Sequence, residues 1–264
     1  MCSFTQIPIS KHMIKRIIKR ILSYFNLRIS RINTNYDIDY PREFIEIYSQ
    51  CKDYTATSIE RMYALYEAVK YISQNKIEGE IVECGVWKAG SCMLIAKTLK
   101  RLGDIERKII LYDTFDGMTE PTDEDIEVET NQLARNILKK TPKNTDKYNI
   151  WAYAPLEMVK RNMRTTGYPE EKIIYVEGKV EQTLPKHAPE NISILRLDTD
   201  WYESTRHELE SLYPILSLNG ILIIDDYGHF TGARKAVDEY FLKIKKPPYM
   251  SRIDLSGRLI IKSK

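Results

Sequence analysis

The residues best suited to chemistry lie in the segment IVECGVWKAGS, from Ile81 to Ser91, and in IILYDTFDG, which begins at Ile109. Each segment is an apolar run that ends near an acidic residue, Glu83 in the first and Asp113 in the second. In an open α/β sheet, the end of the first strand brings a glycine close to a nucleoside, and the end of the second brings a carboxylate to the ribose. The two segments therefore predict a nucleoside-binding edge.

The turn from Gly85 to Ser91 differs from the common phosphate-binding loops. Its G-x4-G spacing lacks the lysine that follows the second glycine of a P-loop, and it is not the G-x-G-x-x-G of a dinucleotide fold. Glu83 would repel phosphates at this edge but could hold the ammonium group of an amino-acid tail. A ligand that combines a ribose, an ammonium and a sulfonium is S-adenosyl-L-methionine, which is the cofactor that these residues indicate.

Two later apolar runs, ISILRLDTDWY and NGILIIDDYGHF, also stop on acidic residues, which are Asp198 and Asp200 in the first and Asp225 and Asp226 in the second. Adjacent strands lie about 4.8 Å apart, so Asp198 and the Asp225–Asp226 pair could converge at one edge. Converging carboxylates repel one another unless a hard cation joins them, and Mg2+ or Ca2+ prefers oxygen ligands. A single aspartate would more simply cap the next helix. The cluster favours a metal site.

The chain contains four segments in the order ECGVWKAGS, LYDTFDGM, LRLDTDWYEST and LIIDDYGHFTGARKAVDEY. Together they resemble the macrocin O-methyltransferase family, whose members methylate sugar hydroxyls of macrolides and other glycosylated products. The resemblance covers roughly residues 55–262. It implies a doubly wound α/β fold with a mostly parallel seven-stranded sheet of the class I (Rossmann-like) methyltransferase type. It also implies Mg2+-dependent methyl transfer from S-adenosyl-L-methionine, with metal ligands at Asp198, Asp225 and Asp226. Ala89 and Thr199 depart from the family pattern, in which glycine is common at both positions.

The predicted cofactor-binding residues lie at the ends of these strands and at the start of a helix expected from Thr57 to Gln74, which opens with a capping box. They are Thr57, Ser58, Glu83, Cys84, Gly85, Val86, Trp87, Ser91, Asp113, Thr114, Phe115, Gly117, Gly178 and Asp198.

A sugar hydroxyl is a poor nucleophile until a base removes its proton, so the reaction needs a proton acceptor as well as alignment with the methyl group. Asp198 is the first candidate, because cofactor and metal should meet there, and His229 is the second. A lone loop histidine is more often a surface residue, and His207 is expected to face solvent.

Two other functions fit the same residues. A catechol-type O-methyltransferase would use similar chelation on an aromatic diol, and a silent cofactor-binding scaffold would have lost turnover. The number of adjacent carboxylates argues against the scaffold. The acceptor itself, whether a small glycosylated product or a surface polysaccharide, is not specified by the sequence.

Composition agrees with a single globular domain in this 264-residue chain. We expect residues 41–264 to form the methyltransferase domain that the resemblance implies. The net charge of +3 is too small to indicate nucleic acid, and the four cysteines form no CxxC pair. A reducing cytoplasm is the simplest compartment. No apolar run approaches the ~20 residues that cross a membrane.

Residues 1–40 are predicted to be a basic amphipathic arm, and residues 11–31 combine seven Lys and Arg side chains with isoleucines at helical spacing. The arm fits either packing on the protein's own domain or on a second subunit of a homo-oligomer, or contact with the anionic inner face of a membrane. Packing is favoured slightly.

The remaining pattern alternates strands with helices and ends in a helix over 231–245 and a hairpin. The strands are expected near 80–84, 107–112, 172–176, 192–197 and 219–224. Residues 116–150 form a long insertion with an acidic start and a basic end. It is interpreted as a lid that selects the acceptor, with a solvated surface excursion as the alternative.

Overall fold

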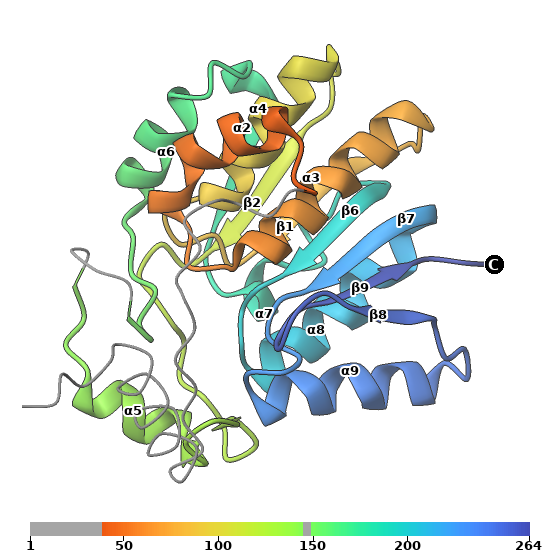
Figure 1. Cartoon of the computed structure of the whole chain (residues 1–264). Helices are drawn as coiled ribbons and strands as arrows, with labels where there is room; N and C mark the ends of the chain where they lie inside the picture. Colours follow the sequence, from red (N-terminus) through yellow and green to blue (C-terminus); the bar gives the residue numbers. More distant parts are fainter. Residues whose placement is uncertain (1–38, 145–148) are drawn as a thin grey trace, which may run out of the picture. The chain divides into compact units, whose positions relative to one another are not determined.

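The computed structural model describes residues 39–144 and 149–264, and the chain from Pro41 to Lys264 forms one compact unit (Figure 1). The predicted arm at residues 1–40, with its membrane or subunit contacts, lies outside the described residues except for its last two. Within the described ranges, no helix combines the length and the apolar content that a membrane crossing requires.

The centre of the unit is a seven-stranded sheet in the order β5-β2-β1-β6-β7-β9-β8. Its strands are β1 (Glu80–Cys84), β2 (Ile109–Asp113), β5 (Ile173–Glu177), β6 (Ile192–Leu197), β7 (Leu216–Ile224), β8 (Met250–Arg252) and β9 (Arg258–Ile261). The first five are parallel, and β9 pairs antiparallel with both β7 and β8. The predicted doubly wound, mostly parallel sheet is confirmed.

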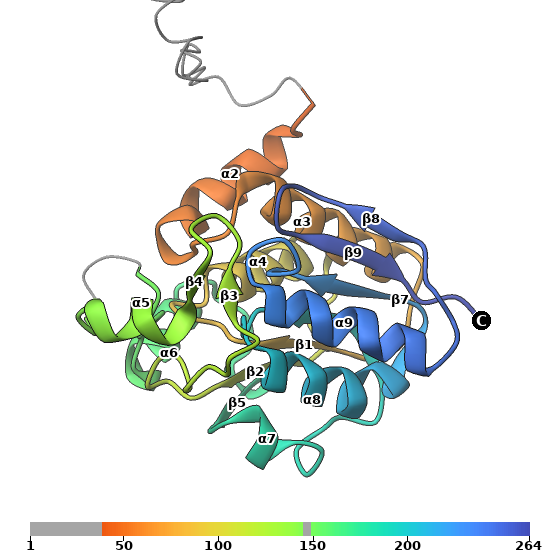
Figure 2. The ribbon, with the colours of Figure 1, turned by 90° about the horizontal axis from the view of Figure 1, so that it is seen from below.

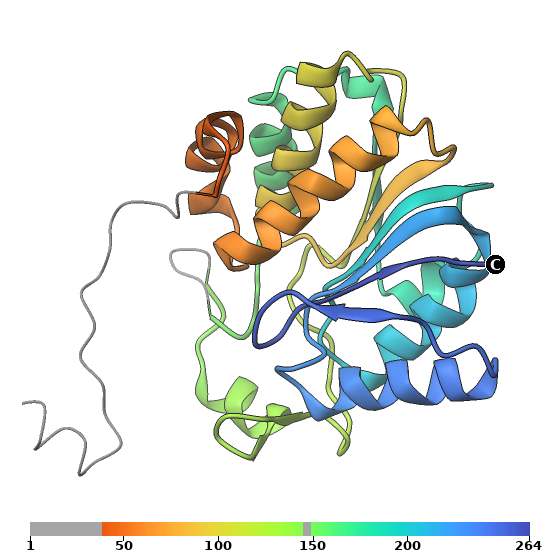
Figure 3. The ribbon, with the colours of Figure 1, turned by 45° about the vertical axis from the view of Figure 1, so that its right-hand side comes forward.

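Helices cover both faces of this sheet (Figures 1 and 3). The helices α2 (Arg42–Cys51), α3 (Ile59–Gln74), α4 (Gly90–Leu102) and α6 (Leu156–Arg164) lie toward one side, and α7 (Val180–Thr183), α8 (Tyr202–Leu212) and α9 (Thr231–Lys243) toward the other. Short 3-10 turns precede α3 (η1, Lys52–Tyr54), precede β5 (η2, Glu170–Lys172) and follow α8 (η3, Tyr213–Ile215). The helix predicted from Thr57 begins at Ile59, because the Ser58 side chain accepts a hydrogen bond from the amide of Arg61 at 3.1 Å.

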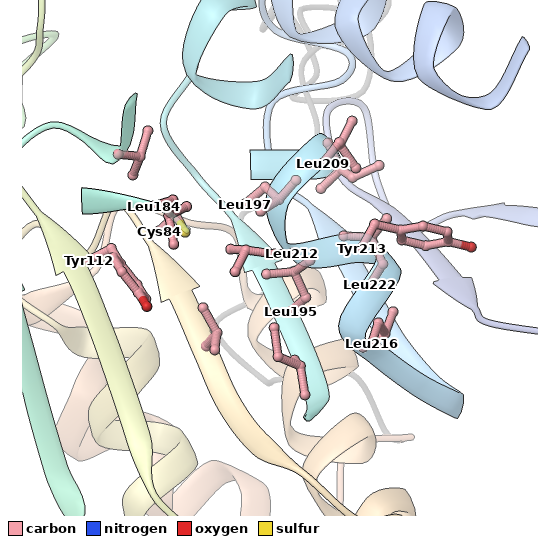
Figure 4. Packing of buried hydrophobic residues seen from close by; sticks show 14 of the residues in the cluster. Cys84, Tyr112, Leu184, Leu195, Leu197, Leu209, Leu212, Tyr213, Leu216 and Leu222 are labelled. Carbon is pink, nitrogen blue, oxygen red and sulfur yellow. The ribbon is translucent and has the colours of Figure 1, made fainter. Parts of the chain in front are cut away.

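The side chains of β6 alternate between the two faces of the sheet, as strand geometry requires. Leu195 and Leu197 pack with Leu209 and Leu212 of α8 in a continuous hydrophobic core (Figure 4). Arg196, between them, points to the opposite face and is almost fully buried. This alternation places one charged side chain behind the functional edge of the sheet.

The register brings four strand ends to the same level. Cys84 is opposite both Tyr112 and Leu197, and Leu197 is opposite Ile224. The residues that follow these positions therefore emerge together at one edge, as expected for parallel strands.

The insertion between β2 and α6 is folded in its described part. It contains a short hairpin, β3 (Ile126–Glu127) and β4 (Gln132–Leu133), followed by α5 (Ala134–Lys140). Ala134 and Leu138 are buried in a second hydrophobic cluster with Trp201 and Phe230, which belong to the loops before α8 and α9. Figure 2 shows the hairpin beside α9. The insertion is thus attached to the main unit through this second apolar cluster, to which both parts contribute side chains.

Candidate active site

A cavity of about 220 Å³ opens at the carboxyl edge of the parallel strands. Many of the predicted site residues line it, namely Thr57, Gly85, Val86, Trp87, Ser91, Asp113, Thr114, Gly117, Gly178, Asp198, Asp225, Asp226 and His229. Ser58, Glu83, Cys84 and Phe115 are not among the lining residues. The structure therefore joins the nucleoside-type edge and the acidic strand ends in one cavity.

Gly85 allows the turn after β1 to lie directly against the end of β6. Its φ is +79°, and a Cβ at this position would lie 2.0 Å from the carbonyl oxygen of Asp198. The amide of Asp198 also donates to the carbonyl of Cys84 at 2.8 Å. Any larger side chain at residue 85 would both strain the backbone and separate the two strand ends.

Asp113 holds the same turn from the β2 side. Its carboxylate accepts hydrogen bonds from the amides of Val86 at 2.7 Å, Trp87 at 3.3 Å and Phe115 at 2.8 Å. Burial raises the pKa of Asp113, and these amides oppose the rise. The amides of Val86 and Trp87 both donate to Oδ2, whereas Oδ1 accepts from the amide of Phe115 and has a longer contact of 3.5 Å with the hydroxyl of Thr114. The carboxylate lines the cavity, and Oδ1 is its oxygen with more room for a ligand hydroxyl group.

Glu83, predicted to contact the cofactor tail directly, is fully buried behind the cavity. Its carboxylate accepts hydrogen bonds from the hydroxyl of Ser91, the thiol of Cys92 and the guanidinium of Arg196. As residue 83 of a strand, it points to the face opposite Val82 and Cys84, which explains why it does not reach the cavity. Near the start of α3, the side chain of Arg61 lines the cavity together with Thr57.

Two arginines that the sequence interpretation did not consider organise the acidic edge. Arg196 pairs with Glu83, with Asp198 at 2.6 Å and with Asp225. Arg61 pairs with Asp225 and, at 3.0 Å, with Asp254 of the β8–β9 turn. Burial alone would lower the pKa of Arg196, but the adjacent carboxylates raise it well above its ordinary value. The signal in the sequence for Arg196 was its position as a charged residue inside the apolar run ISILRL.

Three carboxylates, from Asp198, Asp200 and Asp226, have ligand oxygens within 4.8 Å of one another. Burial and the neighbouring carboxylates raise the pKa values of Asp198 and Asp200 well above their ordinary range, although Arg196 opposes the rise at Asp198. One oxygen of Asp226, Oδ2, is buried and accepts no hydrogen bond from the described residues. The arrangement has the donor set that a hard cation prefers.

Asp225, predicted as a metal ligand, is placed differently from Asp198 and Asp226. Both of its oxygens are bound by arginines, Oδ1 by Arg196 and Oδ2 by Arg61, and the hydroxyl of Thr57 adds a contact at 3.2 Å. The structure gathers Asp200 with the other carboxylates in its place. Asp200 follows Asp198 by two positions, in the same DTD segment. The sequence alone could therefore have indicated that Asp200 lies near Asp198.

His229 lines the cavity between two acidic groups. Its Nδ1 lies 3.8 Å from Oδ1 of Asp226, and its Nε2 lies 3.6 Å from Oε1 of Glu127 in the insertion. The contact with Asp226 raises the pKa of His229, and burial opposes the rise. Of the two candidate bases, Asp198 adjoins the turn at Gly85, whereas His229 adjoins the insertion.

The sheet order, the antiparallel final hairpin and the acidic second strand end define a class I methyltransferase fold. The solved structure of the O-methyltransferase NovP shares this fold with a TM-score of 0.67 and 24% sequence identity, covering 97% of this chain and 100% of that one. The calicheamicin methyltransferase CalS11 shares it with a TM-score of 0.58 and 18% identity, covering 88% and 99%.

The chain belongs to the macrocin-O-methyltransferase (TylF) family, whose model matches residues 49–260. It is 30% identical over 204 residues to 8-demethyl-8-(2,3-dimethoxy-alpha-L-rhamnosyl)-tetracenomycin-C 4'-O-methyltransferase of Streptomyces olivaceus, covering 77% of this chain and 74% of that one. It is 29% identical over 189 residues to mycinamicin III 3''-O-methyltransferase of Micromonospora griseorubida, covering 71% and 70%. The protein is therefore an O-methyltransferase.

Proposed function

We propose that this enzyme transfers a methyl group from S-adenosyl-L-methionine to a sugar hydroxyl of a glycosylated acceptor, and that it uses Mg2+ or a similar divalent cation. The observation that carries the proposal is the single cavity in which the Gly85–Asp113 edge meets the carboxylates of Asp198, Asp200 and Asp226. The relative from Streptomyces olivaceus is named for methyl transfer to a rhamnosyl-tetracenomycin, and this supports a glycosylated acceptor here.

The donor would occupy the side of the cavity formed by the ends of β1 and β2. Asp113 is positioned to accept hydrogen bonds from ribose hydroxyls, and Gly178 lines the cavity beside it. Thr57 and Arg61 offer a hydroxyl and a cation for the carboxylate of the amino-acid tail. Glu83 would act indirectly, by holding Ser91 and Arg196 in place.

The acidic cluster fits a divalent cation by two observations, the convergence of three oxygen ligands and the buried, unpaired Oδ2 of Asp226. Asp198, Asp200 and Asp226 would hold the ion, and Asp225 would support them through Arg196. When bound, the cation would lower the pKa of the acceptor hydroxyl and offset charge that develops on its oxygen.

The chain's own residues supply position and a proton acceptor. Asp198 lies beside Gly85 and within the acidic cluster, so an acceptor oxygen held there faces the donor side. Asp198 would serve both as a ligand and as the proton acceptor, because its carboxylate belongs to the cluster that would hold the acceptor oxygen. Met118 and Thr119 of the insertion also line the cavity, and we assign them to its acceptor side.

The acceptor class is tested with purified enzyme, labelled S-adenosyl-L-methionine and two probes, methyl α-L-rhamnopyranoside and catechol. We expect methyl transfer to the glycoside, its loss in excess EDTA, and its recovery on addition of Mg2+. Transfer to catechol alone would replace the proposed acceptor by an aromatic diol. Undiminished transfer in EDTA would remove the cation from the proposal while leaving the acceptor class standing.

The ligand set is tested by Mn2+ titration monitored by electron paramagnetic resonance. Asp200→Asn should weaken Mn2+ binding by about tenfold or more, because it removes a charged ligand from the cluster. Asp225→Asn should weaken it less if Asp225 serves mainly as the partner of Arg61 and Arg196. The reverse order would return Asp225 to the ligand set in place of Asp200.

A further inference from the structure

Asp125 is fully buried, although it belongs to the acidic start of the insertion. Its Oδ1 accepts a hydrogen bond from the amide of Tyr202 at 2.7 Å, at the first residue of α8. Its Oδ2 accepts from the amide and the hydroxyl of Thr122 at 2.7 and 2.9 Å. The carboxylate therefore attaches the insertion to the main unit two residues after Asp200.

The same carboxylate is also packed against the start of α9. A Cβ on Gly232 would lie 1.9 Å from Oδ1 of Asp125, so only glycine leaves room for it. Next to this contact, the amide of Val128 donates to the carbonyl of His229 at 2.9 Å. The amide of Ile126 donates to the hydroxyl of Thr231 at 3.1 Å. The insertion is thus held to both loops that carry the acidic cluster.

The wall of the cavity depends on these attachments. The indole of Trp201 donates to the carbonyl of Thr119 at 3.0 Å, and its ring meets that of Phe230 at 4.9 Å between centroids. Thr119 and its neighbour Met118 line the cavity. Asp125 accepts a hydrogen bond from the amide of Tyr202, the residue after Trp201, so it holds the backbone from which Trp201 reaches this wall.

We propose that Asp125 is a positioning residue for the acceptor. It fixes the Met118–Thr119 wall relative to the acidic cluster, so that an acceptor oxygen is held at the cluster in one orientation. The donor edge at Gly85 and Asp113 lies at the ends of β1 and β2, where the Asp113 carboxylate holds the turn through the amides of Val86 and Trp87, and none of these contacts involves Asp125. The inference rests on the proposed function, because it assigns the acceptor to this side of the cavity.

The test compares Asp125→Ala and Asp125→Asn with Glu129→Ala, which removes an exposed carboxylate of the same insertion. Asp125→Ala should raise KM for methyl α-L-rhamnopyranoside by about tenfold or more, with a smaller change in kcat, because it removes hydrogen bonds to a charged group. Asp125→Asn keeps one acceptor oxygen and should recover part of the loss. Calorimetric affinity for S-adenosylhomocysteine should be unchanged in all three variants.

Gly232→Ala disturbs the same contact by adding a Cβ atom against Oδ1 of Asp125. It should raise KM in the same way, and the double variant Asp125→Ala/Gly232→Ala should be no worse than the more affected single variant, because both act on one contact. A parallel loss of S-adenosylhomocysteine affinity would reduce Asp125 to a general structural role and overturn the proposal, as would an unchanged KM. If the wild type methylates catechol instead, the proposed acceptor class fails, and the same comparison with catechol still decides the role of Asp125.

Discussion

Replacing Asp198 by asparagine should reduce kcat for methyl transfer by roughly 10²- to 10⁴-fold, the range typical of losing a positioned general base. Asparagine has almost the same shape and keeps one acceptor oxygen, but it has neither the negative charge nor the ability to take a proton. The side chain lies in the acidic cluster at the cavity, and the backbone carbonyl of the same residue lies against the Gly85 turn, so the charge is lost at the point where donor and acceptor would meet. Steady-state kinetics with saturating S-adenosyl-L-methionine measures the effect.

Two further variants test whether the loss of activity is specific to Asp198. Asp238→Asn, which neutralises an exposed carboxylate of α9, should leave kcat unchanged. His229→Asn should cost less than Asp198→Asn, because His229 lies between Asp226 and Glu127 on the insertion side of the cavity. A larger loss in His229→Asn than in Asp198→Asn would transfer the role of base to the histidine.

The sequence predicted those parts of the site that depend on strand ends. The carboxyl ends of neighbouring parallel strands lie at one edge, so Gly85, Asp113, Asp198 and Asp226 could be brought together from the apolar runs alone. Thr57 could be placed beside them because it precedes a helix with a clear capping signal.

The parts that the sequence did not predict depend on which face a side chain occupies and on what it meets there. Glu83 ends an apolar run just as Asp113 does, yet strand alternation turns it toward Ser91 and Arg196 rather than into the cavity. Asp125 belongs to a run of acidic residues that resembles a solvated surface, and only the packing of the insertion on α8 and α9 buries it. Such partners are distant in the sequence, so no local pattern reports them.

Replacing Arg196 by methionine should destabilise the protein by about 3–5 kcal/mol, the cost expected when one partner of a buried ion pair is removed. Methionine fills much of the same space, so the loss would come mainly from charge. Glu83 is fully buried and would be left without its cation, whereas Asp225 would retain Arg61. Urea unfolding monitored by circular dichroism gives the free energy of unfolding, and an unchanged slope would show that the two states remain comparable.

The origin of this loss in an unpaired carboxylate can be tested directly. Adding Glu83→Gln to Arg196→Met removes the stranded charge, so the double variant should be more stable than Arg196→Met alone, even though it carries one more substitution. Arg101→Met breaks exposed pairs with Glu43 and Glu46 and should leave the urea midpoint almost unchanged. If Glu83→Gln lowers stability further in the Arg196→Met background, the loss comes from packing around the guanidinium instead, and the buried charge network is not what holds the acidic edge in place.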